Sequence, residues 1–267
     1  MYELGIIGAG NMAEAIARGV LSSGTFRNDQ IIATDVVEAR RKLFESELGI
    51  KTIDDPAAIA SESKVILLAV KPQSMLTVLE AIAANDTSPD ATIVSIAAGI
   101  TAATIESKLG TRPVVRTMPN TPLMVGLGAV AIAPGKYADA SHLAQARQLF
   151  ESVGVVVEVR EDQLDAVTAL SGSGPAYVFY LAEQMARAGV EMGLPSDVAA
   201  RLAAQTAYGA GKMLMGNDSP VELRRKVTSP GGTTQAAIES MQKAKLDVAI
   251  VEALKAARRR SEELGRG

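Results

Sequence analysis

Three small residues near the start of the chain have the types and spacing needed to hold a phosphate. Gly8, Gly10 and Ala13 follow the apolar run Leu4–Ile7 and open an Ala-rich helical pattern, which predicts a strand, a tight turn and a helix N-terminus. Gly8 permits the turn, Gly10 lets a pyrophosphate approach the backbone, and the N–H groups of the helix start attract its charge. Glycine clusters also form ordinary turns, but a glycine turn directly after a strand at the start of the chain favours a dinucleotide site. We expect Gly8, Gly10, Asn11 and Met12 to bind the dinucleotide.

An acidic residue ends the second predicted strand. Asp35, which follows Thr34, occupies the position where an acidic side chain typically hydrogen-bonds the adenosine ribose. Because such a side chain repels a 2′-phosphate, it favours NAD over NADP. Arg40 and Arg41 follow closely and could neutralise such a phosphate. A solvated helix face shared with nearby glutamates is the other interpretation of these arginines. The sequence therefore leaves NADH and NADPH both open, and we expect Thr34 and Asp35 to bind the coenzyme.

A lysine follows the strand predicted at 64–70. Lys71 is expected at the carboxyl edge of a parallel sheet, where open α/β folds bind ligands, and Pro72 suits the first turn of the next helix. A surface lysine that ends a strand is the alternative. Asn120 could donate to the nicotinamide carboxamide, or it could belong to a plain proline-rich turn. The coenzyme contacts expected at these strand ends are Ala69, Val70, Lys71, Pro72, Ala97 and Asn120.

The most distinctive segment is a glycine-rich bend at 227–237 that enters a helix. Two glycines and several hydroxyl side chains converge there, so backbone N–H groups could hold a small carboxylate while a hydroxyl reaches a neighbouring polar atom. A plain helix cap with Thr233 as the capping residue is an equally good interpretation. The candidate binding residues are Ser229, Gly231, Gly232, Thr233 and Thr234.

Composition excludes much familiar chemistry. The chain has no cysteine and one histidine, so thiol nucleophiles, disulfides and multi-histidine metal sites are excluded, and we expect no metal. A net charge of −3 with 3% aromatic residues predicts no nucleic-acid partner. No apolar run is long enough for a membrane, and Glu3 is untypical of a secretion signal. We expect a cytoplasmic protein without a membrane partner.

The elements that position these residues fall into two halves. Up to about residue 160, apolar β-rich runs alternate with helical patterns, which favours a doubly wound parallel sheet with a possible antiparallel extension. Beyond it, long helical patterns at 175–192, 196–215 and 246–264 replace the strands. The first two are apolar almost all round, so a partner subunit is expected to cover them, although a compact helical core remains the alternative. The chain is therefore predicted to be α/β: an N-terminal Rossmann-type doubly wound sheet at 1–160, followed by an all-helical dimerisation domain at 161–267.

Together, these segments resemble pyrroline-5-carboxylate reductase, the last enzyme of proline biosynthesis. The resemblance covers essentially the whole chain and is most specific in the last two motifs, 170–177 and 227–234. One departure is Asp54-Asp55, where family members often have an asparagine that touches the cofactor ribose. The motifs that carry the resemblance are Gly8-Ala9-Gly10-Asn11-Met12-Ala13, Ala69-Val70-Lys71-Pro72, Arg116-Thr117-Met118-Pro119-Asn120-Thr121-Pro122, Leu170-Ser171-Gly172-Ser173-Gly174-Pro175-Ala176-Tyr177 and Val227-Thr228-Ser229-Pro230-Gly231-Gly232-Thr233-Thr234.

The resemblance implies reduction of the C=N bond of 1-pyrroline-5-carboxylate to L-proline by hydride from NADPH or NADH. It implies that amides around Gly231, Gly232 and Thr233 hold the substrate carboxylate and that Thr234 hydrogen-bonds the ring nitrogen. Thr234 and Lys71 are the expected catalytic residues, with Lys71 near the nicotinamide. It further implies a dimer, or a larger oligomer built of dimers, whose subunits interleave their helical domains.

Three other functions fit parts of the sequence. A β-hydroxyacid dehydrogenase needs a lysine on its long interdomain helix, but no lysine occurs between Lys136 and Lys212. A ferric or coenzyme-F420-linked reductase would share the N-terminal motif but would not explain the bend at 229–234. A non-catalytic dinucleotide sensor would bind NAD(P)H without oxidising it, and nothing in the sequence favours it.

Overall fold

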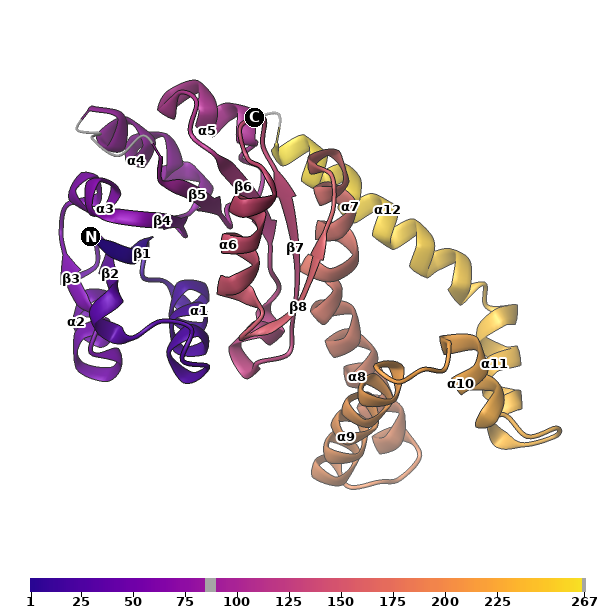
Figure 1. Cartoon of the computed structure of the whole chain (residues 1–267). Coiled ribbons are helices and arrows are strands. Elements are labelled where there is room, and N and C mark those ends of the chain that lie inside the picture. Colours follow the sequence, from indigo (N-terminus) through magenta and orange to yellow (C-terminus); the bar gives the residue numbers. More distant parts are fainter. Residues whose placement is uncertain (85–89, 266–267) are drawn as a thin grey trace. The chain divides into compact units, whose positions relative to one another are not determined.

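The computed structural model describes residues 1–84 and 90–265, which form two compact units (Figure 1). The first unit comprises residues 1–172 together with the end of the chain from Ala257, and the second comprises Ser173–Ala256. The long C-terminal helix contributes to both units.

The first unit is built on one mostly parallel sheet. In the described residues its eight strands lie in the order β3-β2-β1-β4-β5-β6-β7-β8 (Figure 1). Every neighbouring pair is parallel except β6 and β7, so β7 and β8 run opposite to the other strands. The strands are β1 (Tyr2–Ile7), β2 (Ile31–Thr34), β3 (Lys51–Ile53), β4 (Ser63–Leu68), β5 (Thr92–Ser95), β6 (Val114–Met118), β7 (Gly128–Pro134) and β8 (Gly154–Glu158).

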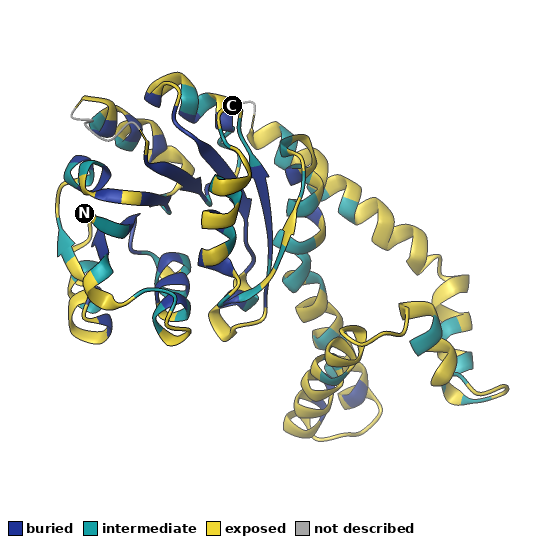
Figure 2. Cartoon of the chain, in the orientation of Figure 1, coloured by how far each residue is buried: buried dark blue, intermediate teal, exposed yellow. Residues whose placement is uncertain are grey.

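Helices cover both faces of this sheet, and each face has its own apolar core. Leu4 and Ile6 of β1 pack in one core with residues of α1, α2 and α6, whereas Ile7 packs in the other with residues of α3, α4 and α5. The inner strands are dark blue in Figure 2 because they are covered on both sides, whereas the edge strands β3 and β8 are partly exposed. The helices are α1 (Asn11–Ser22), α2 (Glu38–Leu48), α3 (Pro56–Glu62), α4 (Pro72–Ala84), α5 (Ala102–Leu109), α6 (Ala140–Phe150) and α7 (Leu164–Val167), and the shorter turns are η1 (Asn28–Gln30), η2 (Thr121–Val125), η3 (Glu161–Gln163) and the π-helical η4 (Thr168–Gly172).

The second unit is helical and has very little core of its own. Among its residues only Gly189, Ala199 and Ala203 are buried. Gly189 of one long helix faces Ala199 of the next so closely that a Cβ on the glycine would lie 3.1 Å from the alanine Cβ. Most of the unit is therefore exposed, as the yellow helices of Figure 2 show. Its helices are α8 (Gly174–Glu191), α9 (Ser196–Leu214), α10 (Pro220–Lys226), α11 (Thr233–Lys243) and α12 (Leu246–Leu264), the last of which ends in the first unit.

The observed elements confirm the predicted fold class. The doubly wound sheet is present, and the antiparallel extension predicted for its later strands begins at β7. The short strand β3 was not predicted from the sequence. Among the described residues, no helix combines the length and the apolar character that crossing a membrane requires.

Candidate active site

The glycine turn after β1 has the backbone geometry that close approach of a phosphate requires. Gly8 has φ +97°, and a Cβ there would lie 2.7 Å from the carbonyl oxygen of Ala69, so only glycine fits. Gly10 precedes α1, and apart from its chain neighbours no described residue has an atom within 4 Å of where its Cβ would lie. Asn11 and Met12 begin the helix, so their N–H groups lack intrahelical acceptors. These residues fit the pyrophosphate of a dinucleotide.

Both main-chain polar groups of Ala9 are held by side chains that follow β2. The Ala9 N–H donates to Asp35 Oδ2 at 2.7 Å, and the Ala9 carbonyl oxygen accepts from Arg40 Nε at 2.6 Å. Asp35 Oδ1 accepts a further N–H from Val37 at 2.8 Å. The glycine turn and the segment after β2 are therefore fastened to each other.

Arg40 also belongs to a chain of alternating charges between α1 and α2. Its Nη2 lies 2.8 Å from Glu14, whose other oxygen pairs with Arg18, and Arg18 in turn pairs with Glu47. Burial alone raises the pKa of Glu14, but hydrogen bonds from Arg40 and Arg18 outweigh it, so the Glu14 pKa lies below its ordinary value. Arg41 donates to the main-chain oxygen of Asp35. The sequence predicts a solvated helix face that these arginines share with Glu38 and Glu45. Instead, both arginines are half-buried and donate to main-chain oxygens. Glu38 pairs with Lys42, and Glu45 accepts a hydrogen bond from Thr52 Oγ1.

Lys71 and Asn120, both expected at the carboxyl edge of the sheet, differ in what they can offer a ligand. Lys71 is exposed, and its carbonyl oxygen accepts from Ser74 N at the start of α4. Asn120 is buried: its Nδ2 donates to Ser171 O at 3.1 Å and its Oδ1 accepts from Ala129 N at 2.9 Å. The Asn120 side chain therefore braces the backbone around it and retains one N–H for a ligand.

The glycine-rich bend lies in the second unit, between α10 and α11. Gly231 has φ +70°, and the helix begins directly after Gly232. Gly232 N donates to Ser229 O at 3.0 Å, and Gly231 N donates to Gln235 Oε1 at 2.7 Å. Thr233 and Thr234, the first residues of α11, have no intrahelical acceptors for their N–H groups. A carboxylate would therefore find two open donors at the threonines and a third, at Gly231, that the Gln235 side chain covers.

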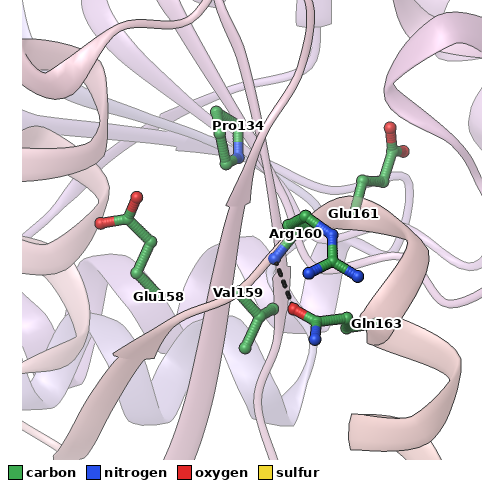
Figure 3. Close-up of a pocket in the computed structure, with 6 residues that line it drawn as sticks. All are labelled: Pro134, Glu158, Val159, Arg160, Glu161 and Gln163. Carbon is green, nitrogen blue, oxygen red and sulfur yellow. Dashed lines mark hydrogen bonds between the residues drawn. The ribbon is translucent and has the colours of Figure 1, made fainter.

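The hollow drawn in Figure 3 is a different place. It has a volume of about 500 Å³ and is lined by residues from the ends of β7 and β8 and from η3, with Arg160 N donating to Gln163 Oε1 at 3.0 Å. Since β7 and β8 run opposite to the other strands, their carboxyl ends lie at the other edge of the sheet from the glycine turn. None of the predicted site residues lines this hollow, whose lining residues are Pro134, Glu158, Val159, Arg160, Glu161 and Gln163.

The structure thus gathers the predicted coenzyme residues in the first unit and the predicted substrate residues in the second. Two roles were not evident from the sequence: that of Arg40 as a brace of the glycine turn, and that of Gln235 as an acceptor for Gly231 N. Only the role of Gln235 could have been predicted from the sequence. Gln235 is the third residue of α11, and a glutamine at this position commonly accepts from backbone N–H groups at the start of a helix.

The fold and the glycine turn define a dinucleotide-binding oxidoreductase, and residues 3–99 match the family model described as NADP oxidoreductase, coenzyme F420-dependent. Residues 161–264 match the model described as pyrroline-5-carboxylate reductase dimerisation. A curated pyrroline-5-carboxylate reductase from Synechocystis is 42% identical, covering 99% of this chain and 98% of its own length. The chain therefore belongs to the pyrroline-5-carboxylate reductase family, as the motifs indicated.

Solved structures agree with this assignment. A pyrroline-5-carboxylate reductase from Coxiella burnetii has a TM-score of 0.94 at 35% identity, with 98% of both chains covered. The Plasmodium falciparum pyrroline carboxylate reductase, solved with NADP bound, has a TM-score of 0.86 at 28% identity, covering 99% of this chain and 98% of its own.

Proposed function

We propose that this chain reduces 1-pyrroline-5-carboxylate to L-proline with NADH or NADPH, the last step of proline biosynthesis. The observation that carries the proposal is the open face of Gly10 at the start of α1, in a chain that matches curated reductases of this name over nearly its whole length. The bound coenzyme supplies a hydride to the imine carbon, and a proton on the imine nitrogen completes the product.

The chemistry of the imine decides what the chain must provide. Hydride addition to a C=N bond is easy only when the nitrogen is protonated, so the site needs a hydrogen-bonding group at nitrogen and an anchor for the carboxylate. Neither task needs histidine, cysteine or a metal. A threonine hydroxyl is a weak acid, so Thr234 orients a protonated imine or relays a proton from water.

The bend before α11 suits the carboxylate. Thr233 and Thr234 offer open N–H groups at a helix start, where the backbone dipoles favour a negative charge. Gly231 adds a third donor once the Gln235 side chain moves aside. Ser229 and Gly232 shape the bend through the bond between the Ser229 oxygen and Gly232 N.

The coenzyme is held in the first unit. Gly8, Gly10, Asn11 and Met12 bind the pyrophosphate, and Thr34 with Asp35 binds the adenosine ribose. Lys71, exposed at the carboxyl end of β4, lies toward the nicotinamide and acts as the second catalytic residue. The remaining coenzyme contacts in this proposal are Ala69, Val70, Pro72, Ala97 and Asn120.

The second unit mediates self-association as a dimer, or as a larger oligomer built of dimers. Its support is the match of residues 161–264 to a dimerisation model and the large apolar side chains exposed on α8 and α9, among them Phe179, Tyr180, Leu202 and Tyr208. We place the boundary between the two domains after residue 160, and the protein in the cytoplasm, without a nucleic-acid or membrane partner.

A spectrophotometric assay tests the activity. The ultraviolet absorbance of NADH and of NADPH is followed separately after addition of 1-pyrroline-5-carboxylate, and the product is identified as proline by chromatography. Oxidation of either coenzyme that depends on the substrate and yields proline supports the proposal. Tight coenzyme binding without oxidation would instead indicate a dinucleotide sensor and refute it.

A further inference from the structure

The segment that follows β2 holds a fixed negative charge at the adenosine end of the coenzyme site. Asp35 accepts N–H groups from Ala9 at 2.7 Å and from Val37 at 2.8 Å, one on each carboxylate oxygen. Two backbone amides therefore keep this side chain beside the glycine turn. A carboxylate at this place can accept bonds from ribose hydroxyls, whereas a 2′-phosphate would bring further negative charge against it.

Arg40, which could have compensated that charge, is already committed. Its Nε donates to the Ala9 carbonyl oxygen at 2.6 Å, and its Nη2 lies 2.8 Å from Glu14. Turning this guanidinium toward a phosphate would break a bond that shapes the glycine turn and would leave Glu14 with one cationic partner fewer. Moving Arg40 to a 2′-phosphate would therefore disturb the glycine turn that binds the pyrophosphate of the same coenzyme.

Arg41 is the nearer competitor. It donates Nη1 to the main-chain oxygen of Asp35, so its guanidinium supports the turn after β2 rather than neutralising the carboxylate. Recruiting Arg41 to a 2′-phosphate costs that hydrogen bond and still leaves the Asp35 carboxylate in place.

We infer that Asp35 makes this chain select NADH over NADPH. This inference rests on the proposed function for its reaction, but it concerns coenzyme binding, which can be measured without the substrate. From the sequence, Arg40 and Arg41 could have neutralised a 2′-phosphate and so favoured NADPH. In the structure, both arginines donate to main-chain oxygens instead.

The test compares two single charge removals in the full-length protein. Fluorescence titration of the reduced nicotinamide gives dissociation constants for NADH and NADPH in the parent, in Asp35→Asn and in Glu38→Gln. Glu38 is a matched control, since it is an exposed carboxylate three residues away that pairs with Lys42. We expect the parent to bind NADH at least about tenfold more tightly, the size of one like-charge contact in a partly exposed site.

Asp35→Asn retains an acceptor for Ala9 and should lower the NADH:NADPH affinity ratio by about tenfold or more, while Glu38→Gln leaves it unchanged. Tighter NADPH binding by the parent, or equal effects of the two substitutions, would overturn the inference. The parent alone decides the first point, should Asp35→Asn fail to fold. An NADH preference without turnover of 1-pyrroline-5-carboxylate would instead leave this inference intact and refute the proposed function.

Discussion

The hydroxyl of Thr234 lies in the first turn of α11, beside backbone N–H groups that have no acceptor within the helix. We expect Thr234→Ala to lower kcat by about 10²- to 10⁴-fold, the usual range for a positioned proton-transfer group, and to leave the dissociation constant of the coenzyme unchanged. Thr234→Ser keeps the hydroxyl and should restore much of the rate. Steady-state kinetics and coenzyme titration check both variants, and an unchanged kcat in Thr234→Ala would refute the role.

Gly8 and Gly10 have different constraints in the structure, in line with the different roles expected for them. Gly10→Ala should leave the free energy of unfolding nearly unchanged, because its φ is −70° and the new Cβ lies more than 4 Å from every described residue other than its chain neighbours. It should nevertheless weaken coenzyme binding strongly, since the methyl group enters the space left for the pyrophosphate.

Gly8→Ala should reduce both stability and binding, because its φ of +97° and the 2.7 Å approach to Ala69 O strain any side chain. Urea denaturation and NADH titration of both variants separate the two effects. If Gly10→Ala lowered the free energy of unfolding as much as Gly8→Ala, the prediction that a methyl group fits at Gly10 without contacts would be contradicted.

At the scale of elements, the charges between α1 and α2 make the attachment of these helices sensitive to acid. The lowered pKa of Glu14 means that its ion pairs stabilise the fold above the ordinary glutamate pKa of 4.5, and that this stabilisation is lost as the pH falls below it. Glu14→Gln should therefore destabilise the protein at neutral pH and should differ less from the parent in acid. Urea unfolding of both proteins across this range measures the difference, and a gap that widened in acid would contradict the assignment.

The elements also show where sequence patterns suffice. Strands β4, β5 and β6 are predictable because each contains consecutive β-branched or leucine residues and is almost fully buried. Strand β3 is not predictable from the sequence, because it has only three residues, begins with the exposed Lys51 and has no apolar run. Its place at the edge of the sheet comes from pairing with β2, which is a tertiary contact.

The candidate site divides in the same way. Asp35 is predictable because it directly follows the second strand, where an acidic side chain commonly hydrogen-bonds the adenosine ribose of a dinucleotide. The role of Arg40 is not, because its partner is the main-chain oxygen of Ala9, and backbone acceptors have no signature in the sequence. Charge patterns along a helix suggest partners on the same helix, whereas Arg40 pairs with Glu14 of α1 and both arginines donate to main-chain oxygens.

For the whole molecule, the second unit poses the main energetic problem. Three buried residues cannot hold its helices in water, and the exposed faces of α8 and α9 carry large apolar side chains. We expect Phe179→Asp to convert the oligomer to a smaller species and to lower activity, because a charge replaces an aromatic ring that is 66% exposed in the single chain. Sedimentation velocity measures the change in mass.

Glu191→Gln is the matched control, because it changes an exposed polar side chain of the same helix, which pairs with Arg187. It should leave the mass unchanged. A parent protein that sediments as a monomer, or a Phe179→Asp variant with unaltered mass, would contradict the proposed self-association.

The double fastening of Ala9 restricts how coenzyme choice could be re-engineered in this chain. A transplant of the stretch 35–41 from an enzyme with the opposite preference would also remove the two side chains that keep the neighbouring glycine turn in shape. Successful redesign would therefore have to exchange the loop after β1 and the start of α2 as one cassette, or retain Arg40 and alter the carboxylate alone.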